Sequence, residues 1–263
     1  MNQPMLRRIL SFVPAFQPFT RILSPKGDQL SRLIMSQATT DGLDDTQVKL
    51  LAEQCILVDR DDNVIGAATK KDCHLYENIQ KGMLHRAFSV FLFNTKGELL
   101  LQQRSDAKIT FPGFWANTCC SHPLHFDEEM ELKDALGVKT AARRKLKHEL
   151  GIEPEQVPIE GFTYLTRVHY QAASNEGVWG EHEIDHVLVF QGDVDLNPEP
   201  NEVQEVCYVN PTQLEELLCA GDKEEKKVSP WFAKISRHLL IPKWWTKLED
   251  VKSFQDHDTI HRL

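Results

Sequence analysis

The chain has 263 residues, 41% of them hydrophobic, and a formal net charge of −9 at pH 7. This composition is typical of a globular protein with a sizeable core, and the acidity argues against a general nucleic-acid-binding protein. Six cysteines are too few for a disulfide scaffold in a chain of this length, and no apolar run reaches membrane-spanning length. We therefore expect a soluble protein with reduced thiols.

The two ends of the chain differ from the rest. Residues 1–40 carry five basic side chains and one acidic side chain, and Pro14 and Pro18 interrupt them. This composition is typical of a mitochondrial transit peptide, and a disordered tail explains it equally well. The last residues, His261-Arg262-Leu263, are similar to the Ser-Lys-Leu peroxisomal signal except at the first position. We expect the peroxisome or the cytoplasm, with mitochondrial targeting through the N-terminal segment as an alternative.

The pattern between these ends predicts two hairpins early in the chain. The apolar run CILVD at 55–59 is followed by the turn residues of DRDDNVIG, which predicts strand, turn and strand. RAFSVFLFN at 86–94 is apolar on both faces, as is typical of a buried central strand. The turn TKG at 95–97 then leads into ELLLQQRS, the second strand of that hairpin.

A helix is predicted from Asp134 to Leu150, with Gly151 as its C-terminal cap. Glu149 lies in the apolar stripe of this helix with Ala142 and Leu146, and a carboxylate on a buried face needs a partner.

The rest of the chain completes a mixed α/β pattern. Strands are predicted at 163–172 and 183–192, separated by a turn at 174–177, and a further helix begins at Asn210-Pro211 and is closed by Gly221. The sequence thus predicts one mixed α/β domain over 46–250, an N-terminal extension over 1–45 and a C-terminal tail over 251–263.

The strand that begins GEHEID carries carboxylates at every second position. Alternation places Glu181, Glu183 and Asp185 on one face, where carboxylates repel unless a cation lies between them. A solvent-facing acidic edge is the alternative, but the strand continues into VLVF, which is apolar on both faces. Histidines could complete a ligand set for Mn²⁺, Mg²⁺ or Zn²⁺, although none of their spacings is a standard metal motif and most histidines are ordinary surface or core residues. The candidates are His74, His85 and His122.

Other chemically active side chains gather near the same hairpins. Lys70, Lys71, Arg104 and Lys108 favour a phosphorylated substrate, with a solvated face as the alternative. Trp231 could stabilise a cation through its ring face or simply fill the core. The stretch NTCCSHPL at 117–124 leaves three alternatives open: a fragment of core, half of a zinc site, or an acid and nucleophile facing a substrate.

Several long motifs in this order resemble the type I isopentenyl diphosphate isomerases, a branch of the Nudix fold. They are KKDCHL, LHRAFSVFLFN, LLLQQRSDAKITFPGFWANTCCSHP, RRKLKHELG, WGEHEID and SPWF, and the resemblance runs from about Gln47 to the C-terminus. It implies a Nudix-type fold with mixed β-sheets sandwiched by helices. It also implies the interconversion of isopentenyl and dimethylallyl diphosphate, a 1,3-allylic proton shift that supplies isoprenoid and sterol biosynthesis.

The resemblance implies roles for particular residues. Cys120 would be one acid/base residue, and Glu183, assisted by Tyr170, would be the other. One divalent metal, Mg²⁺ or else Mn²⁺ or Zn²⁺, would be held by His74, His85, His122, Glu181 and Glu183, and Glu149 would bind Mg²⁺ associated with the diphosphate. Lys70, Arg104, Lys108 and Ser121 match substrate-binding positions, and Trp231 matches the aromatic residue that faces the carbocation. We expect a monomer that acts on isopentenyl diphosphate, with no nucleic acid and no membrane insertion.

One departure from the general Nudix pattern separates the main alternatives. The helix keeps Arg144, Glu149 and Gly151 but lacks the cluster of glutamates with which Nudix-type diphosphate hydrolases gather Mg²⁺, and this favours an isomerase. A second alternative is a noncatalytic module in which Cys119, Cys120 and the histidines bind structural zinc. Oxidation of Cys119 and Cys120 to a strained bridge is a further hypothesis, since it would silence an enzyme that uses Cys120.

Overall fold

The structure is a computed structural model that describes residue 40 and residues 42–174 and 177–263. The strands and helices named below all lie within one compact unit, residues 42–263. Residues 1–39, on which the transit-peptide hypothesis depends, lie outside the described residues.

Strand β3 (His85–Phe93) is the centre of the fold, and all of its residues are buried. One edge pairs in parallel with β8 (Gly180–Gln191), which pairs antiparallel with β7 (Thr163–Ala173). The other edge pairs antiparallel with β1 (Gln54–Val58), β6 (Cys119–Ser121) and β4 (Leu99–Arg104) in turn. The prediction of a central strand from an apolar run on both faces is confirmed, because β3 is covered on each side.

The remaining strands extend this mixed sheet. β2 (Val64–Thr69) pairs with β1, and both β5 (Trp115–Ala116) and β9 (Val203–Val209) pair with β4. β10 (Ile260–Arg262) runs parallel to β7, so the C-terminal segment joins the sheet. A run of three residues carries no strand signal of its own, so the sequence predicts this segment only as part of a tail.

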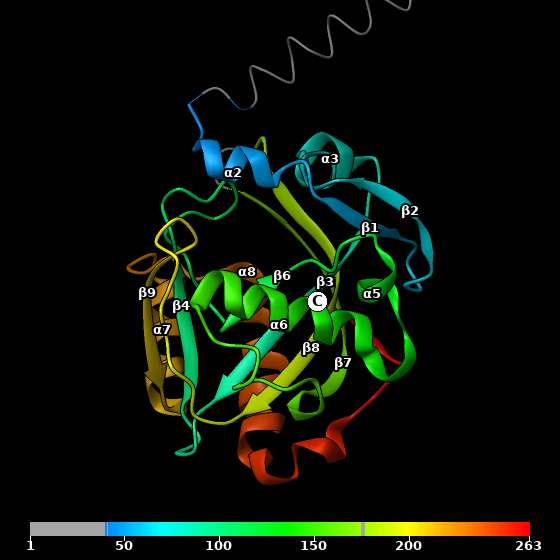
Figure 1. The fold of residues 1–263 in the computed structure, drawn as a ribbon. Helices are drawn as coiled ribbons and strands as arrows, with labels where there is room; N and C mark the ends of the chain where they lie inside the picture. Colours follow the sequence, from blue (N-terminus) through cyan, green and yellow to red (C-terminus); the bar gives the residue numbers. More distant parts are fainter. Residues whose placement is uncertain (1–39, 41, 175–176) are drawn as a thin grey trace, which may run out of the picture. The chain divides into compact units, whose positions relative to one another are not determined.

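Helices cover both faces of the sheet (Figure 1). Phe88, Val90 and Leu92 of β3 pack in one core cluster with the long helix α6 (Leu136–Leu150). Phe91 and Phe93 pack in a second cluster with the C-terminal segments α8 (Pro230–Ile235), η3 (Ser236–Trp244) and η4 (Trp245–Phe254). This division follows from the alternation of side chains along a strand. The predicted mixed α/β fold, with the sheet sandwiched by helices, is confirmed.

Helix α6 begins two residues later than predicted. Asp134 and Ala135 have left-handed backbones, with φ of 53° and 55°, and they end the short segment η1 (Lys133–Ala135) before the regular helix starts. At the other end Gly151 adopts φ 66° as the predicted cap. The next long helix, α7 (Pro211–Asp222), has the predicted cap at Asn210, but Gly221 lies inside it and does not end it.

The other helices are short. They are α2 (Asp45–Leu50), α3 (Lys70–His74), α4 (Tyr76–Gln80), α5 (Asp127–Met130) and η2 (Ile159–Gly161). No helix within the described ranges has both the length and the apolar character needed to cross a membrane.

Candidate active site

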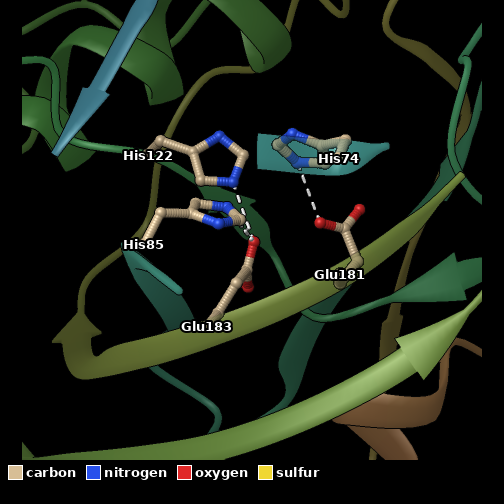
Figure 2. Close-up of side chains that lie close together, drawn as sticks. All are labelled: His74, His85, His122, Glu181 and Glu183. Carbon is tan, nitrogen blue, oxygen red and sulfur yellow. Dashed lines mark hydrogen bonds and ion pairs between the residues drawn. The ribbon is translucent and has the colours of Figure 1, made fainter. Parts of the chain in front are cut away.

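Three histidines and two glutamates from separate elements meet beside the start of β3 (Figure 2). His85 is the first residue of β3 and lies opposite Glu183 in the register with β8. His74 ends α3 and His122 follows β6. We call this group the imidazole cluster; its members, all buried, are His74, His85, His122, Glu181 and Glu183.

The carboxylates of the imidazole cluster face the imidazole rings directly. His74 Nε2 lies 2.9 Å from Glu181 Oε2, and His122 Nε2 lies 2.8 Å from Glu183 Oε1. His182, which lies between Glu181 and Glu183 in the sequence, is on the other face of β8. Its Nδ1 contacts the Met83 carbonyl at 2.8 Å. The alternation predicted for this strand therefore holds, and it brings the two carboxylates to one side.

The cluster fits a divalent metal ion. One ligand atom from each member lies within 4.8 Å of the others. His85 Nε2 and Glu181 Oε2 are buried, and neither makes a hydrogen bond with correct geometry to any described residue. His85 Nε2 nevertheless lies near Glu183, and Glu181 Oε2 lies near His74. Burial alone would raise the pKa of Glu183, but His85 holds that pKa below its ordinary value. Orphaned nitrogen and oxygen ligand atoms around two carboxylates are what a cation would satisfy.

The adjacent cysteines of β6 point to opposite sides of the strand. The Cys119 side chain is fully buried in the core with its Sγ 3.5 Å from Glu149 Oε2, whereas Cys120 lines a cavity. Both thiols are free, and opposite orientations on an extended strand argue against a bridge between them. Burial raises the pKa of the Cys120 thiol well above its ordinary value, and Asp185 and Glu183 raise it further, so this thiol holds its proton at neutral pH.

Two aromatic residues form another side of the same cavity. The Tyr170 hydroxyl donates a short hydrogen bond to Glu183 Oε2, and its ring lies 6.0 Å from that of Trp231 at an interplanar angle of 28°. Trp231 Nε1 donates to Asn117 Oδ1 at 3.2 Å, which fixes the indole from behind. The cavity thus presents an aromatic face beside the tyrosine that touches Glu183.

Cationic side chains gather beside the aromatic residues of this cavity, and we call this group the cationic cluster. Lys108 pairs with Glu202, and Lys145 Nζ lies 3.2 Å from Glu149 Oε1. The other members are Lys70 at the start of α3 and Arg104 at the end of β4. The Glu149 carboxylate also accepts a hydrogen bond from Gln102 Nε2 at 3.1 Å. The sequence predicts that this buried glutamate of α6 needs a partner, and the structure identifies Lys145 and Gln102.

Arg104 also shapes the loop that follows β4. Its guanidinium donates to the Thr110 carbonyl at 2.7 Å and to the Phe111 carbonyl at 3.2 Å, and it lies 5.7 Å from the centre of the Trp231 ring. The loop that carries Lys108 is therefore fixed against the aromatic side of the cavity.

The structure brings the predicted residues to one cavity of about 40 Å³. Glu183 and His85 lie behind its wall, and the other predicted residues line it: Lys70, His74, Arg104, Lys108, Cys120, Ser121, His122, Glu149, Tyr170, Glu181 and Trp231. Gln47 and Leu51 also line the cavity, although no sequence motif marks them as site residues. Sites for small ligands usually enclose roughly 300 to 1,000 Å³, so a substrate needs this cavity to widen.

Comparison with known proteins places this site in a family. Residues 83–232 match the NUDIX domain, and the solved structure of DR0079 from Deinococcus radiodurans has the same fold. That structure superposes with a TM-score of 0.50 at 19% identity, covering 70% of this chain and 98% of the other. The chain is therefore a Nudix-fold protein.

Curated relatives narrow the class. The chain is 57% identical to Isopentenyl-diphosphate Delta-isomerase 1 of Bos taurus over 87% of its own length and 100% of the relative. It is 53% identical to Isopentenyl-diphosphate delta-isomerase IDI1 of Gibberella zeae over 87% and 90%. Isopentenyl-diphosphate delta-isomerase 2 of Homo sapiens is 48% identical over 87% and 100%. The chain belongs to the isopentenyl-diphosphate Delta-isomerase family.

Proposed function

We propose that this protein isomerises isopentenyl diphosphate to dimethylallyl diphosphate in isoprenoid biosynthesis. One observation carries the proposal: the Cys120 thiol and Tyr170, which donates to Glu183, line one cavity together with cationic side chains. Full-length relatives that bear the isomerase name support it. A Nudix-type hydrolase is not favoured, because α6 carries one carboxylate, Glu149, where hydrolases gather several.

The cationic cluster would receive the diphosphate. Lys70, Arg104 and Lys108 line the cavity together with the Ser121 hydroxyl, and guanidinium and ammonium groups bind phosphate oxygens through charge-assisted hydrogen bonds. Anchoring the anionic end on this side directs the short hydrocarbon end toward Cys120, Tyr170 and Trp231. The binding contacts thus set the orientation in which proton transfer occurs.

The reaction adds a proton to the terminal carbon of the double bond and removes one from the saturated carbon on the other side of the resulting cationic carbon, so that the double bond moves by one position. Cys120 on β6 and Glu183 on β8 lie on strands that flank β3 on opposite edges, so they approach from two sides. We assign one as the acid and the other as the base, with the Tyr170 hydroxyl sharing the proton of Glu183. The Trp231 ring face would stabilise the cationic intermediate, and the bound substrate would have to displace the water that would otherwise trap it.

The imidazole cluster would hold the metal, and we propose Mg²⁺, with Mn²⁺ and Zn²⁺ as the alternatives. When bound, the ion would offset the buried carboxylate charge and tune the basicity of Glu183. A second Mg²⁺, associated with the substrate diphosphate, would bind at Glu149, whose two oxygens face Lys145 and Gln102. His85 and His122 would keep Glu183 oriented toward the Tyr170 side of the cavity.

Assembly state and compartment belong to the same proposal. We propose a monomer, in the peroxisome or the cytoplasm, with mitochondrial import as the alternative and sterol precursors among the downstream products. The peroxisomal alternative has a structural requirement: Arg262 contacts His169 Nδ1 at 2.8 Å, and the Leu263 amide donates to the His169 carbonyl at 3.0 Å. An import receptor could read residues 261–263 only after they separate from β7.

Proton NMR in D₂O tests the activity. Isopentenyl diphosphate is incubated with metal-reconstituted protein, beside a Cys120→Ala control. The proposal expects dimethylallyl diphosphate containing deuterium, no released phosphate, and neither change in the control. Phosphate release would favour the hydrolase, and an unchanged spectrum from folded, metal-loaded protein would refute the isomerase.

A further inference from the structure

Glu202 is a buried carboxylate at the cavity that the proposed reaction does not use. It precedes β9 and is 2% exposed, and its backbone carbonyl accepts from the Ser105 amide at 3.0 Å. That contact ties it to the loop after β4, which carries Lys108. Glu202 lies 94 residues from Lys108 in the chain, so no local pattern links the two.

The two oxygens of Glu202 have different partners. Oε2 accepts a short hydrogen bond from Lys108 Nζ, and Oε1 accepts from Gln47 Nε2 at 3.1 Å. Gln47 belongs to α2 and also donates to Asn201 Oδ1 at 2.7 Å. Gln47 and Lys108 both line the cavity. The Glu202 carboxylate therefore connects helix α2 to a lysine of the cavity wall.

Lys108 depends on this carboxylate for its charge. Its side chain is 10% exposed, and the groups that face it are Lys70 and Arg104, which disfavour its charge, and Glu202 and Glu149, which favour it. Burial lowers the pKa of Lys108 to about 8 even with Glu202 present. Burial alone would raise the pKa of Glu202, but Lys108 and Lys145 hold it well below its ordinary value, so the carboxylate is charged at every physiological pH.

We propose that Glu202 is a positioning residue for the diphosphate pocket, holding Lys108 protonated and in place while tethering α2 to the same pocket through Gln47. This inference rests on the proposed function, because it assumes that the cationic cluster receives a diphosphate. Glu202 provides the negative charge opposite the Lys108 ammonium group before the substrate binds. After binding, the diphosphate also provides negative charge at Lys108. Without Glu202 the ammonium group is buried beside other cations and loses its proton at a lower pH.

The test is calorimetric titration of inorganic pyrophosphate with Mg²⁺ into the full-length protein between pH 6 and pH 9. Glu202→Gln keeps the size of the side chain and removes its charge. Glu205→Gln, the same change at an exposed position of β9, is the matched control. At each pH the dissociation constant of the variant is divided by that of the unsubstituted protein. The ionisation of pyrophosphate affects both constants equally, so it does not change this ratio.

The proposal expects this ratio to rise with pH. Loss of the Glu202 charge lowers the pKa of Lys108 further below about 8, so binding weakens roughly tenfold or more at pH 8, whereas at pH 6 the two proteins bind within about twofold. Gln47→Ala, which breaks the tether but leaves the charge, should change affinity by the same factor at each pH. A Glu202→Gln ratio that stays flat across the range overturns the proposal.

Replacement of the lysine provides an independent readout. Lys108→Arg carries a charge that does not titrate in this range, so in the Glu202→Gln background it should remove the added pH dependence. If Glu202→Gln does not fold, as judged by circular dichroism, Glu202→Asp decides, because it keeps the carboxylate but shortens its reach to Lys108. The ratio of dissociation constants for Glu202→Asp should also rise with pH, and a flat ratio overturns the proposal.

Binding of pyrophosphate needs no turnover, so the two claims fail separately. An absence of isomerisation in the NMR experiment with a pH-dependent ratio here would remove the proposed function and leave Glu202 as the support of an anion site. Active isomerase with a flat ratio would remove only the role of Glu202.

Discussion

The two sides of the cavity bury charge in opposite ways. In the imidazole cluster two carboxylates and three imidazole rings bring oxygen and nitrogen ligand atoms together, so the group as a whole can accept a cation. In the cationic cluster, lysines and an arginine outnumber the two carboxylates that face them, Glu149 and Glu202, so that group can accept an anion. Cys120 and Tyr170 line the cavity between them. The difference suggests a division of labour, in which one side binds the substrate and the other controls the protons.

The largest effect should follow from a change within the imidazole cluster. Glu183→Gln removes the proposed base and a proposed metal ligand together while keeping the shape of the side chain, and it should lower kcat by roughly 10³-fold or more. Metal content by atomic absorption should fall in parallel. A variant that keeps both its metal and a near-normal rate would contradict the assignment of Glu183.

Tyr170→Phe should have the next largest effect. It removes the hydroxyl that contacts Glu183 but keeps the ring beside Trp231. We expect kcat to fall about 100-fold, with metal content and melting temperature nearly unchanged, because only proton transfer loses a group. Steady-state kinetics beside metal analysis checks this, and normal turnover would exclude a proton-sharing role for Tyr170.

A buried ion cluster outside the cavity provides a contrast. Asp62 accepts from Arg86 Nε at 2.8 Å and contacts His186 Nε2 at 2.8 Å. Asp62→Asn should cost about 3 kcal/mol of unfolding free energy at pH 7, because it leaves Arg86 buried without its counter-charge. Turnover should remain within about twofold, since no contact here reaches the substrate. Chemical denaturation and kinetics of one preparation measure both quantities.

The same pair predicts the acid response of stability. Burial alone would raise the pKa of Asp62, but His186 and Arg86 hold it below the ordinary value of 3.8. A depressed folded pKa contributes stability above the unfolded pKa and loses it as pH falls through the folded value. The unfolding free energy of the unsubstituted protein should therefore fall more steeply below pH 3.8 than that of Asp62→Asn. Parallel curves would contradict the pairing.

The smallest effect is expected at Cys119. Cys119→Ala should change the rate less than about twofold and cost about 1 kcal/mol of stability, as expected for a small cavity in the core. Inactivation by peroxide should proceed equally in this variant and in the unsubstituted protein, since the two thiols point apart. Protection by Cys119→Ala would revive the disulfide hypothesis.

The sequence predicted features with a local pattern. The period of α6 placed Glu149 on a buried face, alternation placed Glu181 and Glu183 together, and an apolar run identified β3 as central. The sequence identified His74, His85 and His122 only as candidate ligands, because their positions follow no metal spacing. The family resemblance then made them the expected ligands.

Contacts between distant segments could not be predicted in this way. Lys108 with Glu202, Trp231 with Asn117, and β10 with β7 each join residues about 90 or more positions apart. Such pairs depend on the register of the finished sheet, and neither partner carries a distinguishing pattern. For the same reason the sequence predicts that the buried Glu149 has a polar or charged partner but does not identify that partner.

The division of labour is tested most directly by titrating Mg²⁺ and pyrophosphate into Cys120→Ala and Lys108→Met in a calorimeter. Our account predicts that Cys120→Ala binds within about twofold of the unsubstituted protein, whereas Lys108→Met binds at least roughly tenfold more weakly. Equal loss in both variants, or full binding by Lys108→Met, would contradict the claim that one side of the cavity binds and the other moves protons.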